Sequence, residues 1–357
     1  MTKIYEWNEL KGEFHQGSLL LGNGSSISVN ECFKYKSLYE KAKELGYLSS
    51  DVQSVFNKFG VNDFELVLRR LWQAKQVNEA LGIARGEVDH AYEHVRTALI
   101  KTVRETHVTY DEASLHLDAI YKFMKPFDYV ISLNYDLIVY WAMLAGNDTL
   151  GQWFKDCFTP VQFKNDWWNL KGAYKAEGTT LCFYPHGNLI LYRHDFSSER
   201  KINKKDKGSL LDAILEQWEI SDLAPAFVCE GTRDKKVESI SSLHYLEKIY
   251  YEVLTDLSEC LVVYGWGFSD QDGHIIEQIE KSKVKKVAVS VFGNDQVFCG
   301  YVENKLKKMK LTKLRFFNAE SENCWNSSSR EIKGEEFYLG LLSPGEKIVK
   351  IAKIFEI

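Results

Sequence analysis

Short apolar runs that alternate with helical patterns constrain this chain more than any other feature. These runs span residues 18–22, 128–136, 179–187, 225–231, 260–270 and 285–293. Helical patterns over residues 242–257 and 272–282 separate the later runs. Uniformly apolar strands that alternate with helices are typical of a parallel sheet covered on both faces. The sequence therefore predicts an α/β fold, Rossmann-like and doubly wound, with a mostly parallel sheet.

The connection between the first two runs is about a hundred residues long, far more than one crossover helix needs. Within it, apolar residues recur at helical spacing over 64–72, and Asn62 or Asp63 stands where a helix cap is expected. This pattern indicates an inserted group of helices. We predict one domain over residues 1–357, with a helical insertion at about 35–124 and a C-terminal extension at about 316–357.

Composition excludes several classes of protein. The 357 residues are 45% hydrophobic, enough for a sizeable core, and the net charge of −5 gives no reason to expect nucleic acid or an acidic membrane as a partner. The seven cysteines form no C-x-x-C pair, which argues against a zinc ribbon and favours reduced thiols in a cytoplasmic protein. The apolar stretch 129–146 contains Asn134 and Asp136, so we expect no membrane span there.

Polar or glycine-containing segments stand where the predicted strands end. In doubly wound sheets, ligands bind in the loops at the carboxyl ends of the strands. We therefore expect these exits to converge on one crevice: Gly22–Ser26, Asn134–Asp136, His186–Gly187 and Gly265–Asp270.

The first exit, Gly22-Asn23-Gly24-Ser25-Ser26, has the composition of a phosphate-binding turn. Glycine permits positive φ and close approach of backbone N–H groups to an anion, and serine adds hydroxyl donors. The third glycine of G-x-G-x-x-G is absent, and no acidic residue ends a second strand about twenty residues later. These absences argue against a hydride-transfer cofactor, and no Gly-Lys-Ser/Thr of a P-loop follows. An ordinary tight turn is the alternative interpretation.

The second and third exits carry groups suited to catalysis. The amide of Asn134 can orient a ribose hydroxyl or a water, although it can also cap the following helix, and Asp136 can accept from a carboxamide. His186 stands beside a glycine at a strand exit, where an imidazole with a pKa near neutrality can act as a general base.

The fourth exit offers small residues that permit backbone contact with a nucleotide. Gly265 and Gly267 belong to this group, and Ser269 can donate to a phosphate. Asp272 precedes a helical pattern and is expected to be its cap.

In chain order, G-N-G-S-S, S-L-N-Y-D, H-G and G-W-G-F-S-D resemble the signature of the sirtuin superfamily. The similarity is greatest to its bacterial branch without a zinc module, and it covers strand exits over about residues 18–295. The resemblance implies an NAD diphosphate site at Gly22, Asn23, Gly24, Ser25 and Ser26. It implies a catalytic histidine at His186, with Asn134 and Asp136 facing the nicotinamide ribose and carboxamide. It places Gly265, Gly267 and Ser269 on the adenosine side.

Two departures distinguish the chain from deacylating sirtuins. The segment after the glycine turn, SISVNECFKYKSL, lacks a G-I-P-x-F-R-like motif, and the paired C-x-x-C motifs are absent. Protein deacylation is therefore the least favoured activity.

The resemblance implies an NAD⁺ glycohydrolase that releases nicotinamide and ADP-ribose in antiphage defence by abortive infection. We therefore expect NAD as the substrate. Because nicotinamide leaves as a neutral ring, we expect no metal. Control by a homo-oligomer or by a regulatory protein encoded nearby is also expected. The alternative is a non-catalytic sensor that binds NAD or an ADP-ribose-type signal, because a fold and a phosphate loop do not by themselves imply turnover.

Overall fold

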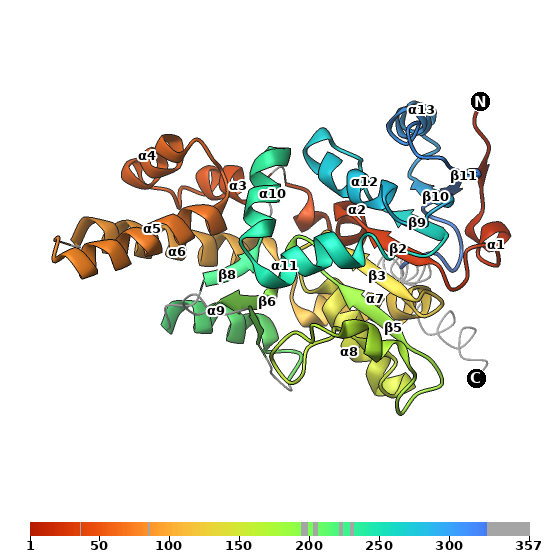
Figure 1. Cartoon of the computed structure of the whole chain (residues 1–357), viewed down its shortest axis with the longest axis horizontal. Helices are drawn as coiled ribbons and strands as arrows, with labels where there is room; N and C mark the ends of the chain where they lie inside the picture. Colours follow the sequence, from red (N-terminus) through yellow and green to blue (C-terminus); the bar gives the residue numbers. More distant parts are fainter. Residues whose placement is uncertain are drawn as a thin grey trace, which may run out of the picture.

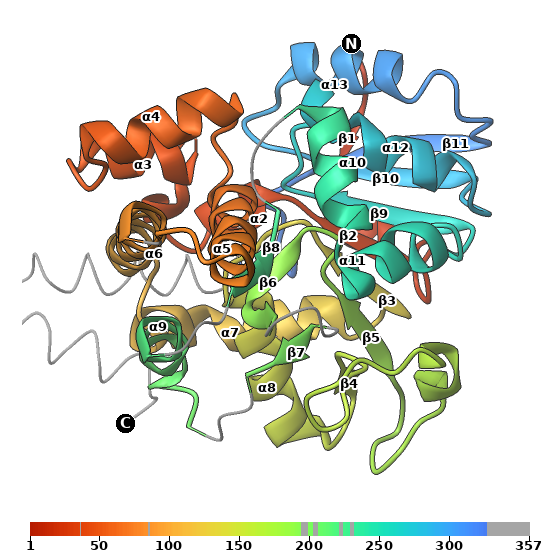
Figure 2. The same cartoon turned by 60° about the vertical axis from the view of Figure 1, so that its left-hand side comes forward.

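An eight-stranded sheet with all neighbouring strands parallel lies at the centre of the computed structural model (Figures 1 and 2). The structure describes residues 1–35, 37–84, 86–193, 199–202, 206–220, 224–228 and 232–326. In sheet order the strands are β1 (Ile4–Tyr5), β11 (Lys313–Asn318), β10 (Lys286–Val291), β9 (Cys260–Tyr264), β2 (Ser18–Leu21), β3 (Tyr129–Ser132), β5 (Thr180–Phe183) and β4 (Phe154–Lys155). This architecture confirms the predicted α/β doubly wound fold.

The six inner strands follow the Rossmann order, β5-β3-β2-β9-β10-β11. Along the chain, β3 and β5 follow on one side of β2, and β9, β10 and β11 then follow on its other side. The order therefore reverses between β2 and β9, whose last residues Leu21 and Tyr264 are paired in register. A crevice opens at such a switch point, outside the carboxyl ends of the strands. Gly22 and Gly265, which follow these two strands directly, lie at that crevice.

The inner strands form because both of their faces are covered. All four residues of β2 and of β3 are buried, and β10 is buried after its first residue. A strand covered on both sides reads as a continuous apolar run rather than an alternating one. This pattern made the strands recognisable in the sequence.

The long connection between β2 and β3 is helical. Its helices are α2 (Asn23–Ile27), α3 (Leu38–Glu44), α4 (Ser50–Phe59), α5 (Phe64–Leu81), α6 (Gly86–Thr106) and α7 (Tyr110–Met124). Figure 1 shows α4, α5 and α6, in orange, extending to the left away from the sheet. Asp63 caps α5 by accepting from the N–H groups of Glu65 and Leu66 at 2.9 and 3.3 Å, as the sequence predicted.

The other helices connect or flank the remaining strands. They are α1 (Trp7–Leu10), α8 (Ile138–Leu150), α9 (Leu210–Ile220), α10 (Arg233–Ser241), α11 (His244–Lys248), α12 (Gly273–Glu280) and α13 (Gln296–Lys305). Helix α7 packs against α8. Within the described part of the chain, no helix is both long and apolar enough to cross a membrane.

The run at 225–231 does not join the parallel sheet. The described residues of this run, 225–228, overlap strand β8 (Ala224–Phe227), which pairs antiparallel with β6 (Gly187–Arg193) in a separate three-stranded sheet that also contains β7 (Arg200–Lys201). Only three residues separate β5 from β6, too few for the crossover that a parallel neighbour requires, so the chain leaves the main sheet at this turn. Strand β8 then pairs with β6 in the second sheet.

The segment after β11 returns to the first turn. The indole Nε1 of Trp325 donates to the Ser25 carbonyl at 2.9 Å, and Asn326 donates to the Ser28 carbonyl at 2.8 Å. The rest of the expected C-terminal extension, residues 327–357, lies outside the described residues.

Candidate functional site

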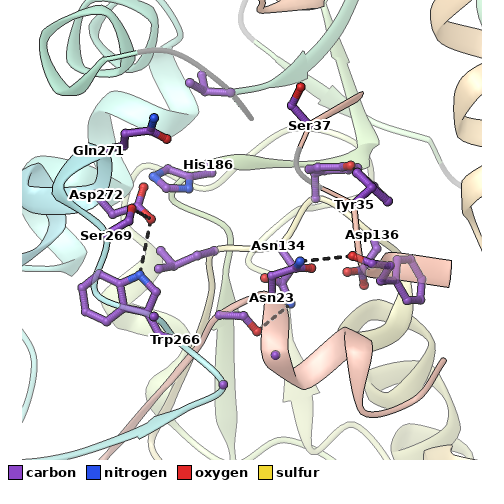
Figure 3. A pocket seen from close by; sticks show the side chains of 18 of the residues that line it. Asn23, Tyr35, Ser37, Asn134, Asp136, His186, Trp266, Ser269, Gln271 and Asp272 are labelled. Atoms are coloured by element: carbon purple, nitrogen blue, oxygen red, sulfur yellow. Dashed lines mark hydrogen bonds between the residues drawn. The ribbon is translucent and has the colours of Figure 1, made fainter. Parts of the chain in front are cut away.

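A pocket of about 470 Å³ opens at the switch point of the sheet (Figure 3). All four predicted strand exits contribute to it, through Gly22, Asn23, Gly24, Asn134, Asp136, His186, Gly265, Gly267 and Ser269. Further lining residues come from the start of the insertion and from later helices: Phe33, Tyr35, Ser37, Leu38, Lys236, Gln271 and Asp272. Segments that are far apart in the sequence thus meet around one cavity.

The glycines of the first and fourth exits allow two loops to touch. Gly24 donates its N–H to the Gly265 carbonyl at 2.7 Å, and Gly265 has a φ of +67°. A Cβ on Gly22 would lie 2.6 Å from the Cα of Trp266, and one on Gly265 would lie 2.3 Å from the backbone nitrogen of Ser25. Close backbone packing therefore requires glycine at these positions, whatever ligand the pocket takes.

Much of the turn's hydrogen-bonding capacity is used inside the protein. The N–H of Gly22 donates to the Tyr264 carbonyl at 3.0 Å, and that of Ser25 donates to the Gly22 carbonyl at 2.9 Å. The hydroxyls of Ser25 and Ser26 are buried beneath the turn and donate to the Gly22 carbonyl and to Asp136 Oδ2, at 2.8 and 2.5 Å. Neither serine lines the pocket described above.

Asn134 connects the second exit to the glycine turn. Its Nδ2 donates to the Gly22 carbonyl and to the hydroxyls of Ser25 and Ser26, at 3.2, 3.0 and 2.8 Å. The amide therefore does not cap the next helix. Asp136 does so instead, since its Oδ1 accepts from the N–H of Ile138 at 2.9 Å, where α8 begins.

A histidine from the insertion supports the same exit. His107 Nε2 accepts from the N–H of Leu137 at 3.0 Å, and its Nδ1 lies 2.8 Å from the Val108 carbonyl. These partners assign the neutral tautomer with the proton on Nδ1. Burial lowers the pKa of His107, which agrees with a neutral ring. Burial raises the pKa of Asp136, and the hydrogen bond from Ser26 opposes that rise.

On the opposite side of the pocket, His186 meets a second histidine. Its Nε2 lies 3.0 Å from Nε2 of His274, the second residue of α12, and both rings are buried. Burial lowers the pKa of His186 below the near-neutral value expected from the sequence and lowers that of His274 to about 4. Both imidazoles are therefore neutral at physiological pH.

Asp272 lies beside these two histidines and is a charged group rather than a helix cap. It stands at the N-terminus of α12, but its side chain makes no capping hydrogen bond. Its Oδ1 lies 2.8 Å from Nζ of the buried Lys236, and its Oδ2 accepts from Ser269 at 3.1 Å. Burial alone would raise the Asp272 pKa, but the paired ammonium of Lys236 helps to hold it below its ordinary value.

His186, Asp272 and His274 offer ligand atoms within 4.8 Å of one another, a donor set that a divalent cation accepts. Two features disfavour a metal. The Lys236 ammonium already neutralises Asp272. The ring centroids of the histidines lie 5.2 Å apart with their Nε2 atoms at 3.0 Å, so the rings point head-on at each other. Two imidazoles that converge on a tetrahedral metal meet at an angle instead.

Sequence reasoning missed Lys236, His274 and His107. Lys236 lies among charged residues that read as a solvated helix face, and nothing near His107 suggested a site. The Asp272-Gly273-His274 sequence directly after a glycine loop was the one usable signal, because both side chains stand where α12 begins at the strand exit.

The strand order and the crevice define a Rossmann-like α/β protein with a ligand-type pocket at the switch point of its sheet. The chain belongs to the family described as Domain of unknown function (DUF4917), whose model matches residues 19–325. The match begins within β2 and ends at Trp325, so it includes every residue that lines the pocket. No curated protein matches the chain significantly.

Proposed function

We propose that this protein is an NAD⁺ glycohydrolase, which cleaves NAD to nicotinamide and ADP-ribose. The observation that carries the proposal is the meeting of Asn134 and His186, from two different strand exits, in one pocket beside the glycine turn. Dinucleotides bind at this position in doubly wound sheets. The resemblance of the four exits to the sirtuin signature supports the same ligand.

A second cavity supports a ligand with two halves. It has a volume of about 690 Å³ and shares Gly24, Gly265, Trp266 and Gly267 with the first pocket. Its wall includes the exposed ring of Phe292, on which an adenine could stack. In this arrangement the nicotinamide ribose lies near Asn134 and His186, and the diphosphate crosses the loop contact.

Cleavage of the C–N bond between nicotinamide and ribose needs few groups from the protein. Nicotinamide leaves as a neutral ring, so cleavage needs a held ribose, a placed water and stabilisation of the oxocarbenium character that develops. Because Nδ2 of Asn134 is fixed by three acceptors, its Oδ1 is the atom that can hold the water or a hydroxyl. His186 polarises a ribose hydroxyl, and Asp136 holds the exit loop through Ser26 and Ile138.

The biological setting rests on the resemblance alone. An enzyme that depletes NAD needs restraint, so we propose an antiphage effector controlled by self-assembly or by a regulatory protein. The proposed cleavage of NAD requires no metal.

The test is nicotinamide release from NAD by the purified protein. Asn134→Ala and His186→Ala are each expected to reduce the rate by about a hundredfold or more, since each removes a group that acts in the transition state. Asn57→Ala and His90→Ala remove the same residue types from exposed positions on α4 and α6 and serve as controls. Unchanged activity in both site variants would reject the mechanism.

A non-catalytic NAD sensor is the second candidate, and one observation favours it. Nε2 of His186 lies 3.0 Å from Nε2 of His274, so this nitrogen is already engaged within the protein. Calorimetric binding of NAD without nicotinamide release, in the presence of any protein that co-purifies, would support the sensor. NAD consumption that depends on an acetyl-lysine peptide would instead indicate a deacylase.

A further inference from the structure

The head-on contact between His186 and His274 has a direction that its surroundings determine. Nδ1 of His274 is buried and has no hydrogen-bond partner among the described residues, so a proton there would be a buried donor without an acceptor. The proton of the neutral His274 ring therefore lies on Nε2. Nε2 of His186, 3.0 Å away, accepts it through its lone pair, so the neutral ring of His186 carries its own proton on Nδ1. His274 must donate its Nε2 proton to the Nε2 lone pair of His186.

His274 is held firmly in this donating position. Its ring is fully buried, and its carbonyl accepts from the Tyr250 hydroxyl at 3.1 Å. Two residues earlier, the carboxylate of Asp272 is paired with Lys236 on α10 at 2.8 Å. Contacts on both sides thus fix the start of α12, and with it the imidazole that faces His186.

The bond occupies the nitrogen that the proposed reaction needs. A base must accept a hydrogen bond from the hydroxyl that it polarises, and the single lone pair of Nε2 accepts one strong bond. We propose that His274 masks the base nitrogen of His186 in the resting site, and that a ribose hydroxyl displaces it before cleavage. This inference rests on the proposed NAD glycohydrolase activity. The exchange breaks one N–H···N bond and forms one O–H···N bond, with no covalent change.

His274→Met tests this proposal because methionine fills a similar space and cannot donate a hydrogen bond to Nε2 of His186. The expected result is an increase of about tenfold in kcat/KM for NAD, the factor that corresponds to one net hydrogen bond. His274→Gln keeps a donor and is expected to stay closer to the wild type. His90→Met removes an exposed histidine from α6 and is the matched control. A fall in kcat/KM for His274→Met, or no change, would overturn the proposal.

The tautomer of His186 supplies a readout that needs no variant and no activity. Nitrogen-15 spectra of the wild-type histidine side chains are expected to show His186 protonated at Nδ1 and His274 protonated at Nε2. Protonation of His186 at Nε2 would overturn the proposal. Loss of the Nε2 proton of His274 on adding stoichiometric Zn²⁺ would also overturn it. If no variant releases nicotinamide, the proposed function fails, and the tautomer alone then decides whether His274 occupies that nitrogen.

Discussion

The two sides of the pocket are built for different purposes. On one side, the glycine turn and the loop after β9 touch through backbone atoms, and Gly22 and Gly265 are required by that contact. On the other side lie Asp272 and His186 (Figure 3). With Lys236 and His274 they form a largely buried polar cluster, the histidine corner. Burying such groups costs free energy that the packing of the fold does not demand. The glycine motif is therefore explained by the packing of the fold, whereas the histidine corner is the stronger indication of a functional site.

Asn134 is the link between the two sides. Its Nδ2 is bound to the turn, and its side chain also lines the pocket. Perturbing the turn should therefore disturb the site through structure, whereas perturbing the corner should alter charge or chemistry.

The largest effect is expected at the loop contact. Gly265→Ala would place a side chain at a φ of +67° and 2.3 Å from a backbone nitrogen, so we expect a loss of stability on the order of 4 kcal/mol. Gly267→Ala is the matched control two residues away, where a Cβ would meet nothing within 4 Å. Urea unfolding of both variants measures the difference. Equal stability of the two would show that the contact is not the reason for Gly265.

The next effect concerns the ion pair of the corner. Lys236→Met leaves the carboxylate of Asp272 without its cation, and we expect a loss of about 3 kcal/mol in the free energy of unfolding. The neighbouring Lys235→Met removes a lysine that donates to the exposed Gly60 carbonyl and should cost much less. Adding Asp272→Asn to Lys236→Met should restore part of the loss. No recovery in the double variant would indicate that the two charges are not coupled.

Ser26→Ala distinguishes a buried hydrogen bond from a phosphate contact. The hydroxyl donates to Asp136 beneath the turn, so its removal should lower the free energy of unfolding by about 1–2 kcal/mol. Calorimetric affinity for ADP-ribose should change little, because the side chain does not line the pocket. Ser54→Ala, on the exposed face of α4, is the control. A large loss of affinity with unchanged stability would instead place the hydroxyl on the diphosphate.

The smallest difference between neighbouring measurements, roughly 1 kcal/mol per pH unit, is expected in the pH dependence of stability. The folded pKa of His274 is lowered from 6.5 to about 4, so the unfolded chain takes up its proton first as the pH falls. The stability present above pH 6.5 is thus lost progressively between pH 6.5 and about 4. Denaturant unfolding at several pH values should show a shallower slope for His274→Met than for the wild type. Equal slopes would contradict a neutral His274.

Local patterns allowed much of the fold to be predicted. The buried strands read as apolar runs, and Asp63 was recognisable as a cap. The four exits were correctly brought to one pocket, because parallel strands end at the same edge of a sheet. The second sheet was missed because β8 looks like any other buried strand, and only its tertiary partner β6 distinguishes it.

The histidine corner could not be predicted for a similar reason. Lys236 and His274 lie on two helices whose sequences show nothing about which residues face each other across the pocket. The serines illustrate the opposite error: hydroxyls next to glycines suggested anion binding, but burial directs them to Asp136 and to the backbone.

The most direct test of the central claim is a crystal structure of the protein with ADP-ribose. We predict the diphosphate over the contact between Gly24 and Gly265, the distal ribose between Asn134 and His186, and the adenine in the cavity beside Phe292. A ligand bound elsewhere, or one whose distal ribose touches neither Asn134 nor His186, would contradict the proposed NAD site.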